Sequence, residues 1–184
     1  MNNGIKRLQE LFQQLYEINN EQRQLWIEYV VFSWQWWVGV GLVVIPWMIW
    51  FLLRKKDSSL RLLSAGFFII FICSWLDSIG IQLGLWRYKY EVIPFTPAFI
   101  PWDISLMPVV TMFFLQVKPD INLYIKGVIF GLFLAFVAEP VSILIDLYEP
   151  LNWKHIYSFP IYFSLYFFSH RICYGRSYNI LTKK

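Results

Sequence analysis

Three acidic residues stand inside or at the edge of apolar segments, where an acid is rarely kept without a use. Asp77 and Glu139 each interrupt a long apolar run, and Asp103 stands at the start of another. A carboxyl group with little water around it tends to hold its proton, which it can then donate to a substrate. The pattern favours acid catalysis, with Asp77 and Glu139 as the candidate catalytic residues. If these two share a site, one keeps the other protonated, because close carboxyls do not both ionise easily.

Aromatic residues accompany these acids in the sequence. The face of an aromatic ring attracts positive charge, each contact contributing about 0.5–2 kcal/mol, so such rings would stabilise a carbocation. Arg87 and Lys154 are nearby cations that could pair with the acids. The candidate substrate-binding residues are Trp86, Tyr88, Trp102, Asp103 and Trp153.

Each acid could also have a purely structural role with no part in catalysis. Asp77 and Glu139 could form hydrogen bonds between helices, and the pair Glu139–Pro140 could mark a helix kink. Asp103 suits the first turn of a helix, where a negative charge is favourable. Asp146 follows Glu139 by seven residues, which places both on one helix face, and near the membrane interface it would simply be solvated.

The composition of the chain indicates which elements must position these residues. Of its 184 residues, 58% are apolar, 21% are aromatic and only 15% are charged. A soluble domain is usually about 45–50% apolar and about 25% charged. Together with a mean hydropathy of +0.48, these values predict a protein whose solvent is lipid.

Five apolar runs of spanning length predict an all-α integral membrane bundle of five transmembrane helices in one domain, residues 29–184. Apolar residues at helical spacing in residues 1–28 predict an N-terminal amphipathic helix, which can lie on the bilayer surface or against the bundle. The predicted transmembrane helices are 29–53, 62–86, 99–117, 123–147 and 156–174.

The distribution of lysine and arginine predicts the orientation of the bundle. Ten of these residues fall on one set of loops and ends, and six fall on the other. The richer side is expected in the cytoplasm, so the N-terminus is predicted outside and the C-terminus inside. In that topology Asp77, Asp103 and Glu139 lie in the outer half of the membrane, and we expect them to line one cavity.

Several other site classes find no support in the sequence. Cys73 and Cys173 stand far apart in apolar segments, and His155 and His170 fall at opposite membrane faces, so no metal site and no cofactor are predicted. The chain contains no HExxH, Walker loop or GxGxxG, and no Ser-His-Asp order. No basic stripe interleaved with aromatics suggests nucleic acid.

Motifs along nearly the whole chain carry a resemblance. The segments FSWQWW, PWMIWFL, LGLWRYKYEVIPF, IPWDISLMP, AEP and NWKHIYSFPIYF are similar to those of an uncharacterised family of small multi-spanning proteins from spore-forming Firmicutes. The resemblance implies a protein of the bacterial cytoplasmic membrane and implies no activity.

A second resemblance covers the central stretch alone. Asp77 is followed nine positions later by Trp86, then by Tyr88 and a loop with Pro94 and Pro97 that ends in Pro101–Trp102–Asp103. This order resembles the signature of membrane carotenoid (lycopene-type) cyclases, and it implies acid-driven cyclisation of an isoprenoid. The chain departs from that signature at Asp103, a single acid where those enzymes have paired glutamates.

Three functional hypotheses follow. The first is an enzyme that acts on an isoprenoid or another lipid by acid catalysis. The second is a non-enzymatic lipid-binding or accessory protein of a larger assembly, with a membrane partner or a second copy of itself. The third is a transporter, which the lack of a clear inverted repeat and the scarcity of polar residues in the inner half disfavour.

Overall fold

The computed structural model describes residues 3–96 and 98–175. Pro97 of the loop, and the tail residues Arg176, Lys183 and Lys184 that enter the charge count, lie outside the described residues. The chain is mostly helical, as predicted, and two short strands join the helices. In chain order the elements are α1 (Asn3–Leu25), η1 (Trp26–Val30), α2 (Trp34–Leu53), η2 (Lys56–Ser58), α3 (Ser59–Gln82), β1 (Trp86–Tyr88), η3 (Pro101–Leu106), α4 (Met107–Gln116), α5 (Leu123–Phe133), η4 (Leu134–Ala138), α6 (Glu139–Leu144), β2 (Tyr148–Pro150) and α7 (His155–Tyr174).

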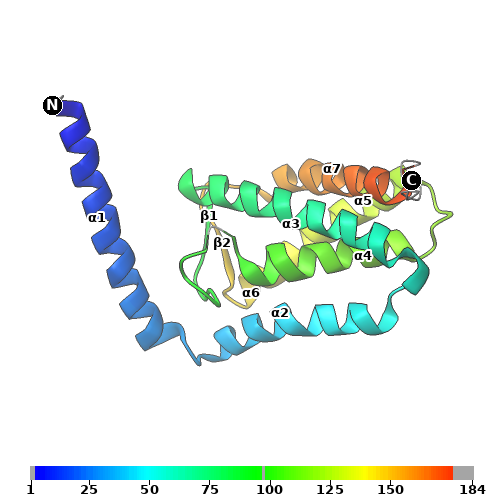
Figure 1. Ribbon diagram of the computed structural model, residues 1–184, viewed down its shortest axis with the longest axis horizontal. Coiled ribbons are helices and arrows are strands. Elements are labelled where there is room, and N and C mark those ends of the chain that lie inside the picture. The colour runs from blue at the N-terminus through cyan, green and yellow to red at the C-terminus, as the bar shows by residue number, and fades with distance from the viewer. Residues whose placement is uncertain (1–2, 97, 176–184) are drawn as a thin grey trace, which may run out of the picture.

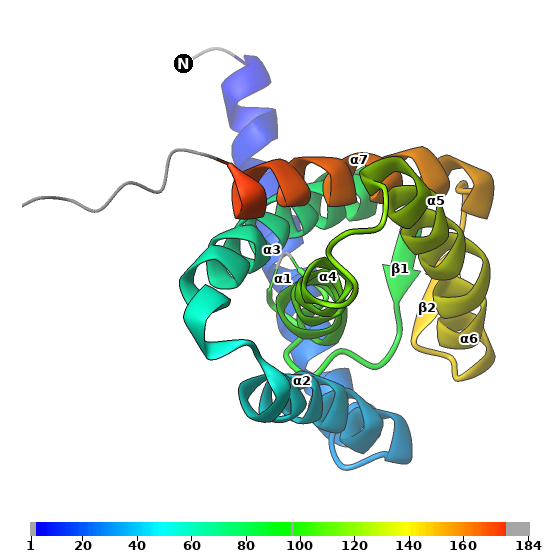
Figure 2. The same ribbon diagram turned by 90° about the vertical axis from the view of Figure 1, so that its right-hand side faces the viewer.

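The helices after α1 run back and forth along the long axis of the molecule (Figure 1). Viewed along that axis, α4 lies in the middle, with α2, α3, α7 and α5 around it (Figure 2). Met107, Met112 and Leu115 of α4 are completely buried, so the core of the bundle forms around α4. The strands and the loop before η3 gather at the end of the bundle where α1 joins α2 (Figure 1).

Three helical segments are long and apolar enough to cross a membrane: Trp34–Leu53, Lys56–Gln82 and Leu123–Leu144. Their outward faces expose large apolar side chains such as Leu52, Phe67 and Leu144. Such faces are costly in water and suit a lipid environment. A membrane location is therefore compatible with the fold.

Two helices end earlier than the apolar runs suggest. The helix expected over 62–86 ends at Gln82, because Gly84 takes a left-handed conformation (φ +65°) that turns the chain into β1. The helix expected over 123–147 ends at Leu144, and Asp146 lies in the following turn with φ +60°. The expectation that Asp146 shares a helix face with Glu139 is therefore wrong.

Glycines let α5 and α7 approach closely. A Cβ atom at Gly127 would lie 3.0 Å from the ring of Phe163, and one at Gly131 would lie 3.1 Å from the carbonyl oxygen of Phe159. Small residues spaced by four positions keep one helix face open to a neighbouring backbone. This packing holds α7 beside the segment that carries Glu139.

The first helix stands away from the bundle. Figure 1 shows α1 running across the direction of the other helices, and it has no buried residue. The chain changes direction after η1, where Phe32 has a positive φ of 65°. The apolar face of α1, which includes Ile5, Leu8, Phe12 and Leu15, is exposed along its whole length.

Candidate functional site

The carboxylate of Asp77 accepts three hydrogen bonds near the end of α3. Its Oδ1 receives the indole N–H of Trp86 at 2.8 Å and the hydroxyl of Tyr88 at 2.9 Å. Its Oδ2 receives the backbone N–H of Phe99 at 3.2 Å. An ionised carboxylate is a pure acceptor, so three converging donors suit the charged form of Asp77. The turn at Gly84 makes this possible, since it folds β1 back over α3.

Asp103 lies against Asp77. It is only 2% exposed, and its Oδ2 accepts the same N–H of Phe99 at 3.1 Å. The two carboxyls therefore lie close together around one shared donor. Both cannot ionise easily at that separation, so we expect the pair to hold one proton. We expect Asp103 to hold it, because Asp77 already accepts three donors. Asp103 is also in the first turn of η3, so its role at a helix start and its contact with Asp77 coexist.

Glu139 has different partners from those expected. It is 6% exposed, its Oε1 accepts the hydroxyl of Tyr162 at 2.8 Å, and its Oε2 lies 2.6 Å from Nδ1 of His155. The expectation that Asp77 and Glu139 directly control one another's proton is therefore wrong, since Asp77 pairs with Asp103. Sequence analysis missed His155 and Tyr162 as site residues. Their spacing of seven in one helix, which places both on the same face, was the available signal.

All three acids line one cavity of about 180 Å³ between α3, η3, α6 and α7. Trp86, Tyr88, Trp102 and Trp153 line it as well, so the structure brings these sequence-predicted residues together. The cavity further includes residues that sequence analysis did not single out, notably Cys73, Phe99, Ser142, Tyr148, Ser158 and Tyr162.

The aromatic rings of the cavity pack against one another. The rings of Trp86 and Trp153 pack edge to face with their centroids 5.1 Å apart, and the ring of Tyr88 stacks on that of Phe99 with a centroid distance of 4.1 Å. The indole N–H of Trp153 donates to Ser158 at 2.8 Å, and that of Trp86 donates to Asp77. Because both N–H donors are used, these two residues present apolar surface to an occupant. The site therefore combines fixed acids with rings suited to a hydrocarbon or a carbocation.

Arg87 and Lys154 lie outside the cavity and do not supply the counter-charge expected for its acids. Successive side chains of a strand point to opposite faces, so Trp86 and Tyr88 face the cavity while Arg87 faces away. Arg87 pairs with Glu149, its partner in the β1–β2 register, at 3.0 and 3.1 Å. Lys154 is exposed, immediately before α7 begins at His155.

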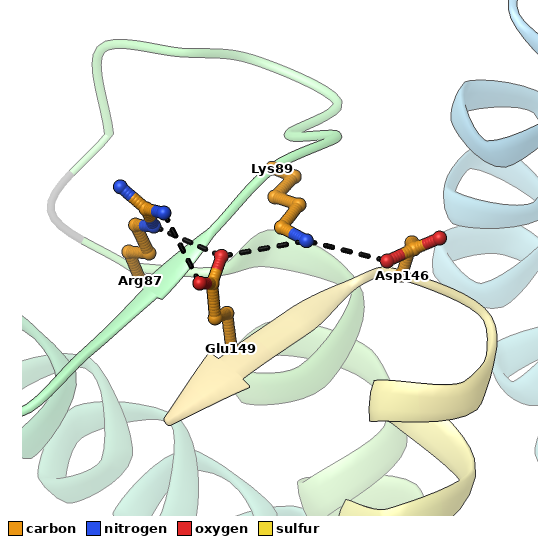
Figure 3. Close-up of polar contacts among 4 residues, drawn as sticks. All are labelled: Arg87, Lys89, Asp146 and Glu149. Carbon is orange, nitrogen blue, oxygen red and sulfur yellow. Dashed lines mark hydrogen bonds and ion pairs between the residues drawn. The ribbon is translucent and has the colours of Figure 1, made fainter. Parts of the chain in front are cut away.

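An ionic cluster links the two strands on their exposed side (Figure 3). Lys89 lies between Asp146 at 3.3 Å and Glu149 at 3.4 Å, and Glu149 also binds Arg87. The hydrogen bond from Arg87 lowers the pKa of the Glu149 carboxyl. Exposed ion pairs contribute little to stability. Their effect here is to set β1 against β2, and hence to position Trp86, Tyr88 and Tyr148 over the cavity.

The loop after β1 is tied to the junction of α1 and α2. The indole N–H of Trp26 donates to the carbonyl oxygen of Glu91 at 2.8 Å, and that of Trp36 donates to the carbonyl oxygen of Val92 at 3.3 Å. Burial raises the pKa of the Glu91 carboxyl to about 7, and the nearby charge of Asp77 adds to the rise. This loop leads directly to Phe99, whose N–H serves both aspartates.

No group of three His, Cys, Asp or Glu residues within 3–96 and 98–175 is placed to hold a metal ion. Comparison of the chain with protein-family models, with curated proteins and with solved structures finds no match. The function is therefore argued from the geometry of the cavity.

Proposed function

We propose that this protein crosses a bacterial cytoplasmic membrane five times, with its N-terminus outside and its C-terminus in the cytoplasm. Three helices have the length and composition of membrane spans. The segment η3–α4 and the helix α7 run between the same two ends of the bundle (Figure 1), which supports counting them as the remaining two. The excess of lysine and arginine on one set of loops supports the orientation.

Cysteine labelling tests this topology. The two native cysteines are buried, so an impermeant maleimide applied to intact cells should report on added cysteines. We expect Leu151→Cys, in the exposed loop after β2, to react from outside, and Asp57→Cys, between α2 and α3, to react only after the membrane is permeabilised. Labelling of Asp57→Cys in intact cells would contradict the proposed orientation and indicate the opposite one.

We further propose that the cavity binds an unsaturated lipid, such as an isoprenoid, and rearranges it by acid catalysis. The observation that carries this proposal is the contact between Asp77 and Asp103 inside an aromatic-lined apolar cavity. A carboxylic acid beside a carboxylate can donate a proton to a substrate, and the pair can later take a proton back. The resemblance of the central stretch to lycopene-type cyclases points to the same chemistry.

The proposed reaction is an isomerisation. Asp103 transfers its proton to one carbon of a C=C bond, and the other carbon becomes cationic. A second C=C bond of the same chain attacks that cation, so a ring closes and the charge moves along the chain. Loss of a proton from a neighbouring carbon to a carboxylate of the pair restores one C=C bond and the starting protonation state. Trp86, Tyr88 and Trp102 would stabilise the cations.

The two other acids of the cavity, Asp77 and Glu139, have supporting roles in this proposal. Asp77 stays a carboxylate, because its three donors favour that form, and it orients the proton of Asp103. Glu139, held by His155 and Tyr162, also lines the cavity, and its carboxyl oxygens would face cationic intermediates there.

Expression in a host that makes long polyprenes tests the enzymatic proposal. Because cyclisation leaves the mass unchanged, products must be separated by chromatography and their C=C bonds counted after hydrogenation. We expect a product isomer with the wild type, and a loss of about 100-fold or more with Asp103→Asn, the usual scale for a general acid. Asp57→Asn, which changes an exposed acid between α2 and α3 and outside the cavity, serves as the control and should retain the product. Extracts identical to empty vector would remove the enzymatic proposal.

A second candidate function is a lipid-binding accessory protein without catalysis. The exposed apolar face of α1 favours it, since residues such as Leu8 and Phe12 are left exposed by the bundle. Under this proposal the same cavity holds a lipid unchanged, and α1 contacts a membrane partner or a second copy. Retention of an unmodified lipid by the purified wild type, with no isomer formed, would favour this function.

A further inference from the structure

An apolar groove runs between α3 and α7 beside the acid cavity. Its volume is about 560 Å³, and it extends from Leu76 and Ile161 to Phe68 and Phe168 farther along the same two helices. Ser164 is the groove's one polar side chain among the described residues, and its hydroxyl donates to the carbonyl oxygen of Pro160 at 2.7 Å. No side chain of the groove therefore offers an occupant a free hydrogen-bond donor, which suits a hydrocarbon chain.

The groove and the acid cavity are adjacent. Leu76, Ile161 and Leu165 line both of them, so these three side chains form the boundary across which an occupant would pass. Leu76 is itself 37% exposed, so the boundary is not sealed within the core. A chain lying in the groove would have its end beside the cavity that Asp77 and Asp103 line.

We infer that the protein takes an uncharged, single-chain unsaturated lipid sideways from the bilayer, with the chain in the α3–α7 groove and its reactive end in the acid cavity. The inference rests on the proposed function for the role of the cavity. It adds a route of entry and a substrate class. The strands β1 and β2 place Trp86, Tyr88 and Tyr148 over the cavity, so the route from the bilayer is the lateral one.

The charges of the cavity exclude an anionic head group. The described residues that line it include three acids and no Lys, Arg or His. Asp77 has the donors that favour its ionised form, and the nearest imidazole, His155, is already in contact with Glu139. A phosphate or diphosphate would therefore meet negative charge in a weakly hydrated site, where like-charge repulsion is strong. An alcohol or a terminal alkene meets no such penalty.

Native mass spectrometry of the purified full chain in detergent tests both parts of this inference. The probes are geranylgeraniol, an uncharged prenyl alcohol, and geranylgeranyl diphosphate, which has the same chain. We expect one molecule of the alcohol to bind, and the diphosphate to bind at least 10-fold more weakly. Equal or tighter binding of the diphosphate would overturn the assigned substrate class.

Blocking the groove tests the route of entry. Ser164→Trp should weaken binding of geranylgeraniol at least 10-fold, because the added indole fills the groove. Ile129→Trp places the same bulk on α5, where Ile129 is 52% exposed and lines neither space, and it should bind like the wild type. Ser164→Cys gives a measurement without added bulk, since bound geranylgeraniol should slow its reaction with a maleimide at least severalfold. Wild-type binding by Ser164→Trp together with unprotected Ser164→Cys would overturn the groove assignment.

The same variants separate this inference from the proposed catalysis. Asp103→Asn should still bind geranylgeraniol within about threefold of the wild type, although it forms no isomer in the expression host. If the wild type binds the alcohol through the groove and forms no isomer, the proposed catalysis is contradicted and the proposed lateral binding site is supported. If Ser164→Trp forms isomer at the wild-type level, the lateral site fails and the catalysis stands.

Discussion

Replacing Asp77 by alanine is expected to lower the stability of the bundle by several kcal/mol, because each buried donor left without an acceptor costs about 1–3 kcal/mol. Two donors have Asp77 as their acceptor, the indole of Trp86 and the hydroxyl of Tyr88, and the N–H of Phe99 would keep only its bond to Asp103. The measurement is the melting temperature of the detergent-solubilised protein, followed by its intrinsic tryptophan fluorescence.

Two further variants calibrate this result. Asp77→Asn keeps an oxygen for Trp86 and Tyr88 but presents an amide toward Phe99 and Asp103, so we expect a melting temperature between those of the wild type and Asp77→Ala. Ser78→Ala changes the adjacent residue, whose hydroxyl accepts a single hydrogen bond from Gln82 at 3.3 Å, and it should melt close to the wild type. Equal melting temperatures for Asp77→Ala and Ser78→Ala would show that the three hydrogen bonds do not stabilise the fold.

Gly80→Ala is expected to destabilise the protein even though alanine is the better helix former. A Cβ atom at position 80 would overlap the indole ring of Trp86, so the ring must move. Overpacking of this kind costs about 1–3 kcal/mol, and displacement of the indole also removes its hydrogen bond to Asp77. A lower melting temperature and an altered tryptophan emission spectrum are the expected results.

Gly41→Ala is the matched control. Its added Cβ would meet only the flexible end of Ile45, at 3.6 Å, in a helix where alanine is favoured over glycine by about 1 kcal/mol. We therefore expect Gly41→Ala to melt at or slightly above the wild-type temperature. A Gly80→Ala protein as stable as Gly41→Ala would contradict the packing of Trp86 against α3.

The broad organisation of the site could be predicted because it depends on position along the axis of the bundle. Alternating spans place the end of one helix level with the start of the next, so Asp77, Asp103 and Glu139 were expected at one end of the bundle. Aromatic residues at helix ends fall at the same level. The helix His155–Tyr174 also begins and ends within one residue of the predicted 156–174, because it has polar residues at both boundaries.

The pairing of side chains within that level could not be predicted. It depends on how each helix is rotated about its axis and on where the chain turns, and an apolar run specifies neither. The contact of Asp77 with Asp103, rather than with Glu139, follows from the turn at Gly84 and the position of Phe99. Likewise Glu139 meets His155 instead of Lys154, since α7 begins with the histidine facing inward. The pairing of β1 with β2 also could not be predicted, because a strand of three residues is too short to show an alternation of polar and apolar side chains.

Two tryptophan hydrogen bonds tie the loop after β1 to the α1–α2 junction. They connect movement of α1 to the position of this loop. At 1.5 Å per residue, the 23 residues of α1 form a lever arm about 35 Å long, and its pivot is the bend at Phe32. Trp26 lies just before that bend and Trp36 just after it, and they bind the carbonyl oxygens of Glu91 and Val92. Tension or curvature that tilts α1 would therefore pull first on Glu91 and then, along the loop, on Phe99. The N–H of Phe99 is shared by Asp77 and Asp103, so the geometry of this pair is coupled to the direction of α1.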